Sequence, residues 1–239
     1  MTNRSDPTGK ARPMASKAGP ILAIETGGRA CSVAIVKDGV AVAEEHIATD
    51  HGQSTLLMPM IERVRAEAGC DYAELGRIAV AVGPGSFTGL RVGLAAALGI
   101  SLASGVPAVG ISSFLAVGIG ILQAPEARHR RGFILLDSRR EEPFLVEIGD
   151  DDTFKFPPRV TTVADFDALL ESAGPAVVFG DAPTLARGAD AFPPEVYVIQ
   201  RAPQVVLVAA RAADPERRFD LPPKPVYVRP PDVTMPKQP

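Results

Sequence analysis

The chain has 239 residues, of which 46% are hydrophobic and 22% charged, with a formal net charge of −3. This composition is typical of a globular protein and excludes a disordered or fibrous chain. The small negative charge lacks the broad basic field that unaided nucleic-acid binding requires, so any contact with RNA is expected through a partner.

The first 19 residues are basic and carry no apolar run, so they predict a disordered extension without a signal peptide. We therefore expect a cytoplasmic protein. Met14 lies just ahead of the first predicted strand and is an alternative translation start. The two cysteines, Cys31 and Cys70, are expected to be buried as small hydrophobic residues.

Residues 20–48 predict a β-meander. Apolar runs at 21–24, 31–36 and 40–47 read as strands, and Lys37-Asp38-Gly39 is typical of a hairpin turn. The first turn, Thr26-Gly27-Gly28-Arg29, is glycine-rich. We expect its backbone N–H groups to point outward.

Residues 54–68 predict a helix that Gly69 ends. Pro59 is tolerated only near a helix start, so the helix either begins near Met58 or bends at the proline. The apolar side chains of this predicted helix cover a wider part of its circumference than contact with a single hydrophobic core requires.

A strand over 77–82 leads through a glycine-rich turn into a predicted helix over 87–104, whose only charged side chain is Arg91. Three interpretations compete: a membrane span, a helix buried within its own domain, and a helix that packs on its sheet and on a partner. The many small residues give too little apolar area for a membrane span. They favour a partner, because they allow close backbone approach.

After residue 106, the alternation of predicted strands and helices begins again. We expect strands over 107–111, 133–136, 143–148, 153–156 and 175–179, and helices over 112–122, 163–172 and 183–189. Two similar βββαβα-like halves result, a first lobe over 20–106 and a second over 107–214. The proline-rich residues 215–239 predict an extended strap over the surface.

The turn at 83–89, Gly-Pro-Gly-Ser-Phe-Thr-Gly, allows two interpretations: a phosphate site at a helix N-terminus, or a tight turn with Ser86 as the helix cap. It lacks the spacing of a P-loop and of a dinucleotide-binding motif. Asp137 lies in a charged turn and either reaches a ligand or partner or belongs to a solvated hairpin. The three histidines, His46, His51 and His129, lack metal-ligand spacing, and no local feature supports a catalytic triad.

Four segments together resemble one protein family. They are Ile21-Leu-Ala-Ile-Glu-Thr, the run from Gly83 to Gly93, Leu136-Asp-Ser-Arg-Arg, and Val226-Tyr-Val-Arg-Pro-Pro-Asp. They are similar to the TsaB (YeaZ) family over about 20–142 and again in the strap. The resemblance implies an α/β, two-lobed actin-like ATPase fold (ASKHA, ribonuclease H-like) with a degenerate nucleotide cleft.

The resemblance also implies a role. TsaB is the non-catalytic partner of TsaD, which transfers the threonylcarbamoyl group to tRNA, and TsaE is an ATPase associated with both. The chain is thus expected to form a dimer with TsaD, to meet tRNA only through the complex, and to pair with itself when TsaD is absent. No cofactor, metal, catalytic residue or membrane is expected, although weak ATP or ADP binding at the partner interface is allowed.

The expected site residues form two groups. The partner interface is assigned to Leu56, Met60, Val64, Leu90, Arg91, Leu94 and Leu98. Nucleotide or phosphate contacts are assigned to Glu25, Thr26, Gly27, Gly85, Ser86 and Thr88. Two departures weaken nucleotide binding: Glu25 stands where the family usually has Asp, and Gly180 is a single glycine where related ATPases have several.

Two enzyme alternatives remain open. A free-standing ATP-dependent small-molecule kinase of the same fold would need a catalytic aspartate in the cleft and tight ATP binding. A metalloprotease would need a pair of histidine ligands, which the sequence lacks.

Overall fold

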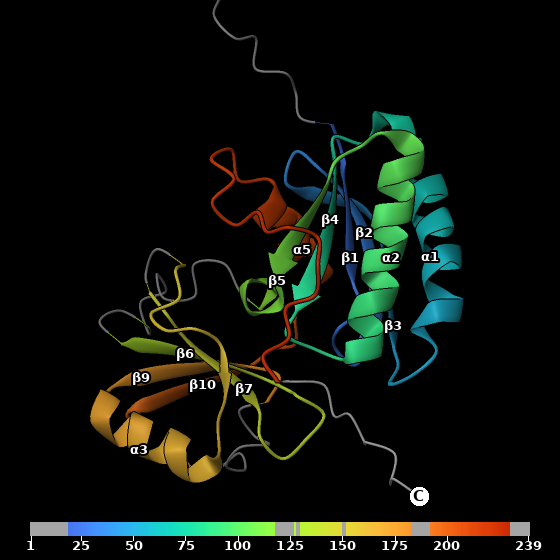
Figure 1. Cartoon of the computed structure of the whole chain (residues 1–239). Coiled ribbons are helices and arrows are strands. Elements are labelled where there is room, and N and C mark those ends of the chain that lie inside the picture. Colours follow the sequence, from blue (N-terminus) through green and yellow to red (C-terminus); the bar gives the residue numbers. More distant parts are fainter. Residues whose placement is uncertain (1–18, 118–126, 128–129, 150–151, 183–191, 230–239) are drawn as a thin grey trace, which may run out of the picture.

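The computed structural model describes residues 19–117, 127, 130–149, 152–182 and 192–229, which form two β-sheets with helices packed on them (Figure 1). The first sheet has the strand order β3-β2-β1-β4-β5. Its strands are β1 (Ile21–Glu25), β2 (Ala30–Lys37), β3 (Val40–Ala48), β4 (Arg77–Gly83) and β5 (Ala108–Ser112). Strands β1, β2 and β3 pair with one another in antiparallel fashion, which confirms the predicted meander, and β4 and β5 run parallel to β1.

The second sheet repeats this plan with the order β10-β9-β6-β7-β8. Its strands are β6 (Arg131–Leu136), β7 (Phe144–Ile148), β8 (Arg159–Val160), β9 (Ala176–Gly180) and β10 (Val196–Gln200). Again the first three are antiparallel, and β9 and β10 run parallel to β6. The predicted repetition of topology is therefore confirmed.

Four α-helices lie on these sheets within the described ranges: α1 (Gln53–Ala68), α2 (Phe87–Ser104), α3 (Val163–Ala173) and α5 (Val205–Ala212). Short 3₁₀ turns cover Tyr72–Glu74 and Ser113–Ala116. In Figure 1, α1 and α2 cover the outer face of the first sheet, and α5 lies on the face turned toward the second sheet.

The apolar residues of β1 explain this layering, because successive side chains of a strand point to opposite faces. Leu22 and Ile24 pack with α1 and α2, whereas Ile21 and Ala23 share a core with α5 and the second sheet. A strand that is buried on both faces needs an unbroken apolar run, which β1 provides.

Several predicted boundaries are wrong. The helix over 112–122 is a 3₁₀ turn at Ser113–Ala116 as far as it is described, and the third strand of the second half lies at Arg159–Val160 instead of 153–156. Neither β10 nor α5 was predicted. The helix expected over 183–189 lies outside the described residues, as does the N-terminal extension over residues 1–18.

The predicted division between the lobes is also wrong. Strand β5 was assigned to the second lobe, but it pairs with β4, and α5 packs on β1, β2 and β4. We therefore define the first lobe as β1–β5 with α1, α2 and α5, and the second lobe as β6–β10 with α3. The chain returns to the first lobe after β10.

Helix α1 begins at Gln53, which agrees with the predicted span of 54–68, so the alternative of a start near Met58 is wrong. Pro59 lies inside the helix, where its side chain is exposed and its ring costs one backbone hydrogen bond. Gly69 ends the helix in the left-handed conformation, as predicted.

The described part of the strap, up to Arg229, is free of helix, as predicted. It pairs with β5 through a bridge between Gly110 and Leu221, and the Val226 N–H donates to the Val82 carbonyl at 2.8 Å. Asp220 forms an ion pair of 2.6 Å with Arg77. The strap thus passes from the amino end of β4, at Arg77, to its carboxyl end, at Val82.

Candidate functional site

The cleft between the lobes begins at the turn after β1, where Glu25 is buried. Its Oε1 accepts hydrogen bonds from the N–H groups of Gly27 (2.8 Å) and Gly28 (3.2 Å). The expectation that these N–H groups point outward is therefore wrong. The longer side chain folds back on its own turn and takes the hydrogen bonds that a bound anion would need.

The electrostatics of this turn are unusual. Burial is the main cause that raises the pKa of Glu25 to about 7, with a smaller contribution from the charge of Asp181, while the two N–H donors lower it. Burial likewise raises the pKa of Asp181 to about 6. Asp181 belongs to the second lobe and accepts the Asp137 N–H at 2.7 Å. Two acids of raised pKa therefore face the same cleft.

The glycine-rich turn before α2 packs directly against the turn after β1. The Ser86 N–H donates to the Gly27 carbonyl at 2.8 Å, and the Thr26 hydroxyl donates to the Gly89 carbonyl at 2.8 Å. A Cβ at Gly89 would lie 2.0 Å from the Thr26 carbonyl oxygen. Ser86 Oγ accepts the Gly89 N–H at 3.3 Å, so the interpretation of Ser86 as the helix cap is confirmed.

Ion pairs join the lobes across the cleft. We call these residues the cleft network: Arg29 and Asp50 of the first lobe, Asp137 and Arg139 of the second. Arg29 Nε donates to Asp137 at 2.7 Å, and both arginines donate to Asp50 Oδ1 at 2.8 Å. Arg139 also donates to the Gly28 carbonyl at 2.7 Å. The Asp137 side chain is only 6% exposed, so the expected solvated hairpin does not describe it.

Sequence reasoning selected Asp137 but missed its partners. Arg29 lies 108 residues away along the chain and belongs to another predicted strand–turn unit. Only the packing of the two lobes brings it to Asp137.

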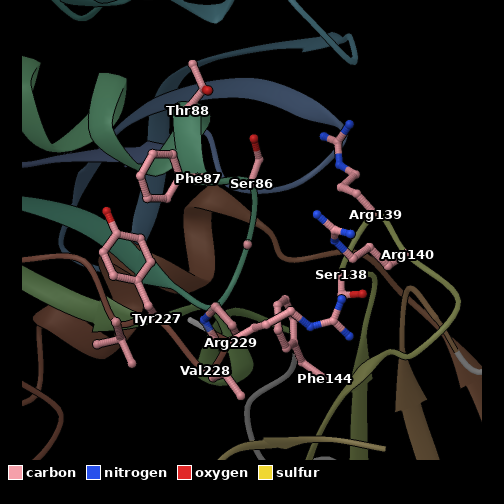
Figure 2. A pocket seen from close by; sticks show the side chains of 13 residues that line it. Ser86, Phe87, Thr88, Ser138, Arg139, Arg140, Phe144, Tyr227, Val228 and Arg229 are labelled. Atoms are coloured by element: carbon pink, nitrogen blue, oxygen red, sulfur yellow. The ribbon is translucent and has the colours of Figure 1, made fainter. Parts of the chain in front are cut away.

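A cavity of about 500 Å³ lies beside this network (Figure 2). Its walls come from the turn before α2 with the start of that helix, the second-lobe turn at 138–140, Phe144 of β7, and the strap at 226–229. Of the six expected phosphate contacts, Gly85, Ser86 and Thr88 line it. The other three, Glu25, Thr26 and Gly27, are buried next to it and bonded within the protein, so their assignment as open ligand contacts is wrong.

The expected partner interface needs a second correction. Met60, Val64, Leu90 and Leu94 are at most 4% exposed because they point toward the sheet, so their assignment to an open surface is wrong. Leu98 is 44% exposed and Arg91 is exposed, whereas Leu56 is partly buried.

Apart from Arg91, both stripes of α2 are apolar, and for this reason the sequence did not show which one faces out. The exposed stripe runs through residues 91, 95, 98 and 102, at helical spacing, and Leu102 is 89% exposed. The buried stripe runs through 90, 94 and 97.

We call the exposed apolar surface of these two helices the α1/α2 face; its residues are Met58, Ala95, Leu98, Gly99, Leu102 and Ala103. It borders a groove of about 650 Å³ between the helices. In Figure 1 the second lobe lies on the opposite side of the first sheet. Among the described residues nothing covers this face.

Two further properties of the described residues bear on function. Helix α2 is long and apolar enough to cross a membrane by composition, a test that the core helix of a soluble protein also passes, and here it packs on β4 and β1. Within the described ranges, no three His, Cys, Asp or Glu side chains lie together as a metal site would require.

Comparison with known proteins places these features in a family. The family model of TsaD, tRNA N6-adenosine threonylcarbamoyltransferase, matches residues 42–154. The tRNA threonylcarbamoyladenosine biosynthesis protein TsaB of Escherichia coli is 32% identical over 133 residues, 55% of this chain and 56% of the relative. An uncharacterized protein of Mycobacterium tuberculosis is 30% identical over 165 residues, 68% of this chain and 72% of the relative.

The solved structures agree on the fold. YeaZ from Pseudomonas aeruginosa superposes with a TM-score of 0.64 at 21% identity, covering 87% of this chain and 99% of that one. This likeness shows that the chain shares the fold of that structure, and its two similar sheets confirm the expected two-lobed α/β architecture. The match spans about half the length of the curated TsaB relative from E. coli. On sequence and fold together, the chain belongs to the TsaB/YeaZ family.

Proposed function

We propose that the chain is a non-catalytic subunit of the complex that forms threonylcarbamoyladenosine in tRNA, and that it docks a TsaD-type partner through the α1/α2 face. The observation that carries the proposal is the exposure of this face. Leu98 and Leu102 stand 44% and 89% exposed on a helix whose outer stripe has a single charge, at Arg91. A contiguous apolar patch of this kind favours a protein interface.

The comparisons support a partner of the TsaD type. The matched residues 42–154 contain both α1 and α2. A tRNA N6-adenosine threonylcarbamoyltransferase of Erythrobacter litoralis is 33% identical over 108 residues, 31% of that protein. A transferase that shares these helices would present a related face, and two related faces pack around a pseudo-twofold axis. The same geometry serves a homodimer when the partner is absent.

The hydrogen bonds in the cleft favour an accessory subunit and not an ATP-dependent kinase. Glu25 bonds the N–H groups of the turn that would hold a nucleotide phosphate, and Arg139 bonds the same turn from the second lobe. In this proposal docking needs no cofactor, and weak ATP or ADP binding accompanies the partner interface. TsaE joins the full complex, tRNA contacts pass through the partner, and the chain works in the cytoplasm.

Co-expression with the TsaD of the same organism tests the proposal. The variants L98E and L102E should lose co-elution in size-exclusion chromatography and lower the tRNA modification yield, because each places a charge in the interface. Both should retain the wild-type unfolding transition.

The control V40E makes the same change at a side chain that is 65% exposed on β3, outside the α1/α2 face, and should co-elute normally. Leu94→Glu, by contrast, would unfold the first lobe, since Leu94 is 4% exposed. Undiminished co-elution of both L98E and L102E would refute the proposed face.

A further inference from the structure

The cavity beside the cleft network has a strongly basic lining. Arg139, Arg140 and Arg229 line it, and no Asp or Glu is among the described residues of its walls. Its volume, about 500 Å³, falls within the range of about 300–1,000 Å³ that small-molecule sites span.

Two of the three guanidinium groups, those of Arg139 and Arg229, donate to oxygen atoms of neighbouring residues. Arg139 is held by Asp50 and by the Gly28 carbonyl. Arg229 donates through Nη2 to Glu142, whose side chain is 47% exposed. Arg140 is exposed, and in Figure 2 its guanidinium lies between Arg139 and Ser138 at the cavity wall. Because each guanidinium has five N–H donors, an arginine with one protein partner retains donors for an anion.

The opposite wall is aromatic. The rings of Phe87 and Tyr227 are 5.1 Å apart at 30°, and the two side chains are 41% and 40% exposed. Arg91 lies over Phe87 at 3.7 Å and donates through Nε to the Tyr227 hydroxyl at 3.1 Å. This pairing holds both rings in place, and Figure 2 shows Phe87 and Tyr227 beside each other, on the side of the cavity away from Arg139 and Arg140.

The two walls fit one kind of ligand. Arginines recognise phosphate through paired N–H donors, and an exposed ring offers a stacking surface for a base. Ser86 Oγ, which accepts the Gly89 N–H, keeps its own proton to donate into the cavity. We propose that this cavity binds a nucleoside phosphate, with the phosphate at Arg140 and Arg229 and the base at Tyr227.

This cavity includes half of the expected phosphate contacts, because Gly85, Ser86 and Thr88 line it. The turn at Glu25, Thr26 and Gly27 does not line the cavity. The α1/α2 face does not line the cavity, although Arg91 of the same outer stripe contacts both aromatic rings. The inference goes beyond the proposed function, and Arg140 and Arg229, which test it, lie outside that stripe.

Isothermal titration calorimetry on the full chain tests the site with four probes: AMP, adenosine, inorganic phosphate and the 5′-phosphorylated trinucleotide pApApA. We expect AMP to bind at least tenfold more tightly than adenosine. The variants R140Q and R229Q should each weaken AMP about tenfold or more, since each removes a charge-assisted hydrogen bond to phosphate.

Two further variants separate stacking from charge. Tyr227→Leu should weaken AMP about fivefold or more but leave inorganic phosphate unchanged. The control R63Q removes the same charge from an exposed arginine of α1 that pairs with Glu45, and it should bind AMP as the wild type does. The thermal unfolding transition of each variant verifies that it is folded.

The trinucleotide identifies the source of the nucleotide. Binding at least tenfold tighter than AMP, and dependent on Arg140, indicates an RNA end; equal or weaker binding indicates a free nucleotide. The proposal is overturned if neither AMP nor pApApA binds at millimolar concentration. It is equally overturned if adenosine matches AMP, or if R63Q weakens AMP as much as R140Q does.

Discussion

The carboxyl group of Glu25 has two opposing influences on the turn after β1. Its hydrogen bonds to Gly27 and Gly28 hold the turn closed, while its burial makes the charged form costly and raises its pKa to about 7. A carboxyl group whose pKa is higher in the folded state binds more protons there than in the unfolded chain. Its favourable contribution is complete below about pH 4.5 and is lost as the pH rises through about 7.

The variant E25Q should therefore flatten the pH dependence of stability. Glutamine keeps an oxygen that accepts the two N–H groups but has no charge to bury. At pH 8 we expect E25Q to be more stable than the wild type by up to about 3 kcal/mol, and at pH 4 the difference should nearly vanish. Urea unfolding at both pH values measures this. Parallel stability curves for the two proteins would contradict the account.

The small residues of helix α2 have different roles on its inner and outer sides. On the inner side, glycines let the helix meet the first turn; a Cβ at Gly93 would lie 2.4 Å from Thr26 Oγ1. On the outer side, a Cβ at Gly99 would meet nothing within 4 Å, and the missing side chain leaves the α1/α2 face shallow. The same residue type thus serves a core contact and an open face.

A pair of glycine substitutions separates these roles. Gly89→Ala should destabilise the protein by about 1–3 kcal/mol, because its Cβ would overlap the backbone of Thr26. Gly99→Ala should stabilise it by about 0.5–1 kcal/mol through helix propensity alone. Thermal or chemical unfolding measures both. Equal effects of the two substitutions would contradict the close packing of α2 on the first turn.

Some of the helices and strands could be predicted from the sequence and others could not. Periodicity located α1, α2 and the first meander, because their apolar patterns are long and local. It did not decide which stripe of α2 faces out, since Leu94 and Leu98 are the same residue type. It missed α5, because this helix is buried against strands that lie more than 100 residues earlier in the sequence. It missed the pairing of Arg29 with Asp137 because these residues, too, are far apart in the sequence.

At the scale of the whole molecule, a shared apolar core, the cleft network and the strap join the two lobes. The buried end of the network is Asp137, at 6% exposure, while Asp50 at its other end is 51% exposed. Exposed ion pairs contribute little because water screens them, whereas a carboxylate that is withdrawn from water depends on its partners.

Neutralising the two acids should therefore have unequal effects. Asp137→Asn should destabilise the folded protein by about 1–3 kcal/mol, and Asp50→Asn by less than about 1 kcal/mol. Chemical denaturation at pH 8 and low salt compares them. A larger loss in the Asp50 variant would mean that the lobes are joined chiefly at the solvent-exposed end of the network.

The central claim is that a TsaD-type partner covers the α1/α2 face, and a fluorescent label tests it most directly. The native Cys31 and Cys70 are free and buried, so an environment-sensitive maleimide dye should react with L102C and with the control V40C at the introduced thiol. On addition of purified TsaD, we predict a blue shift and protection from quenching for the dye on L102C, and no change for the dye on V40C. A dye on L102C that stays fully open to quencher while the complex forms would contradict the claim.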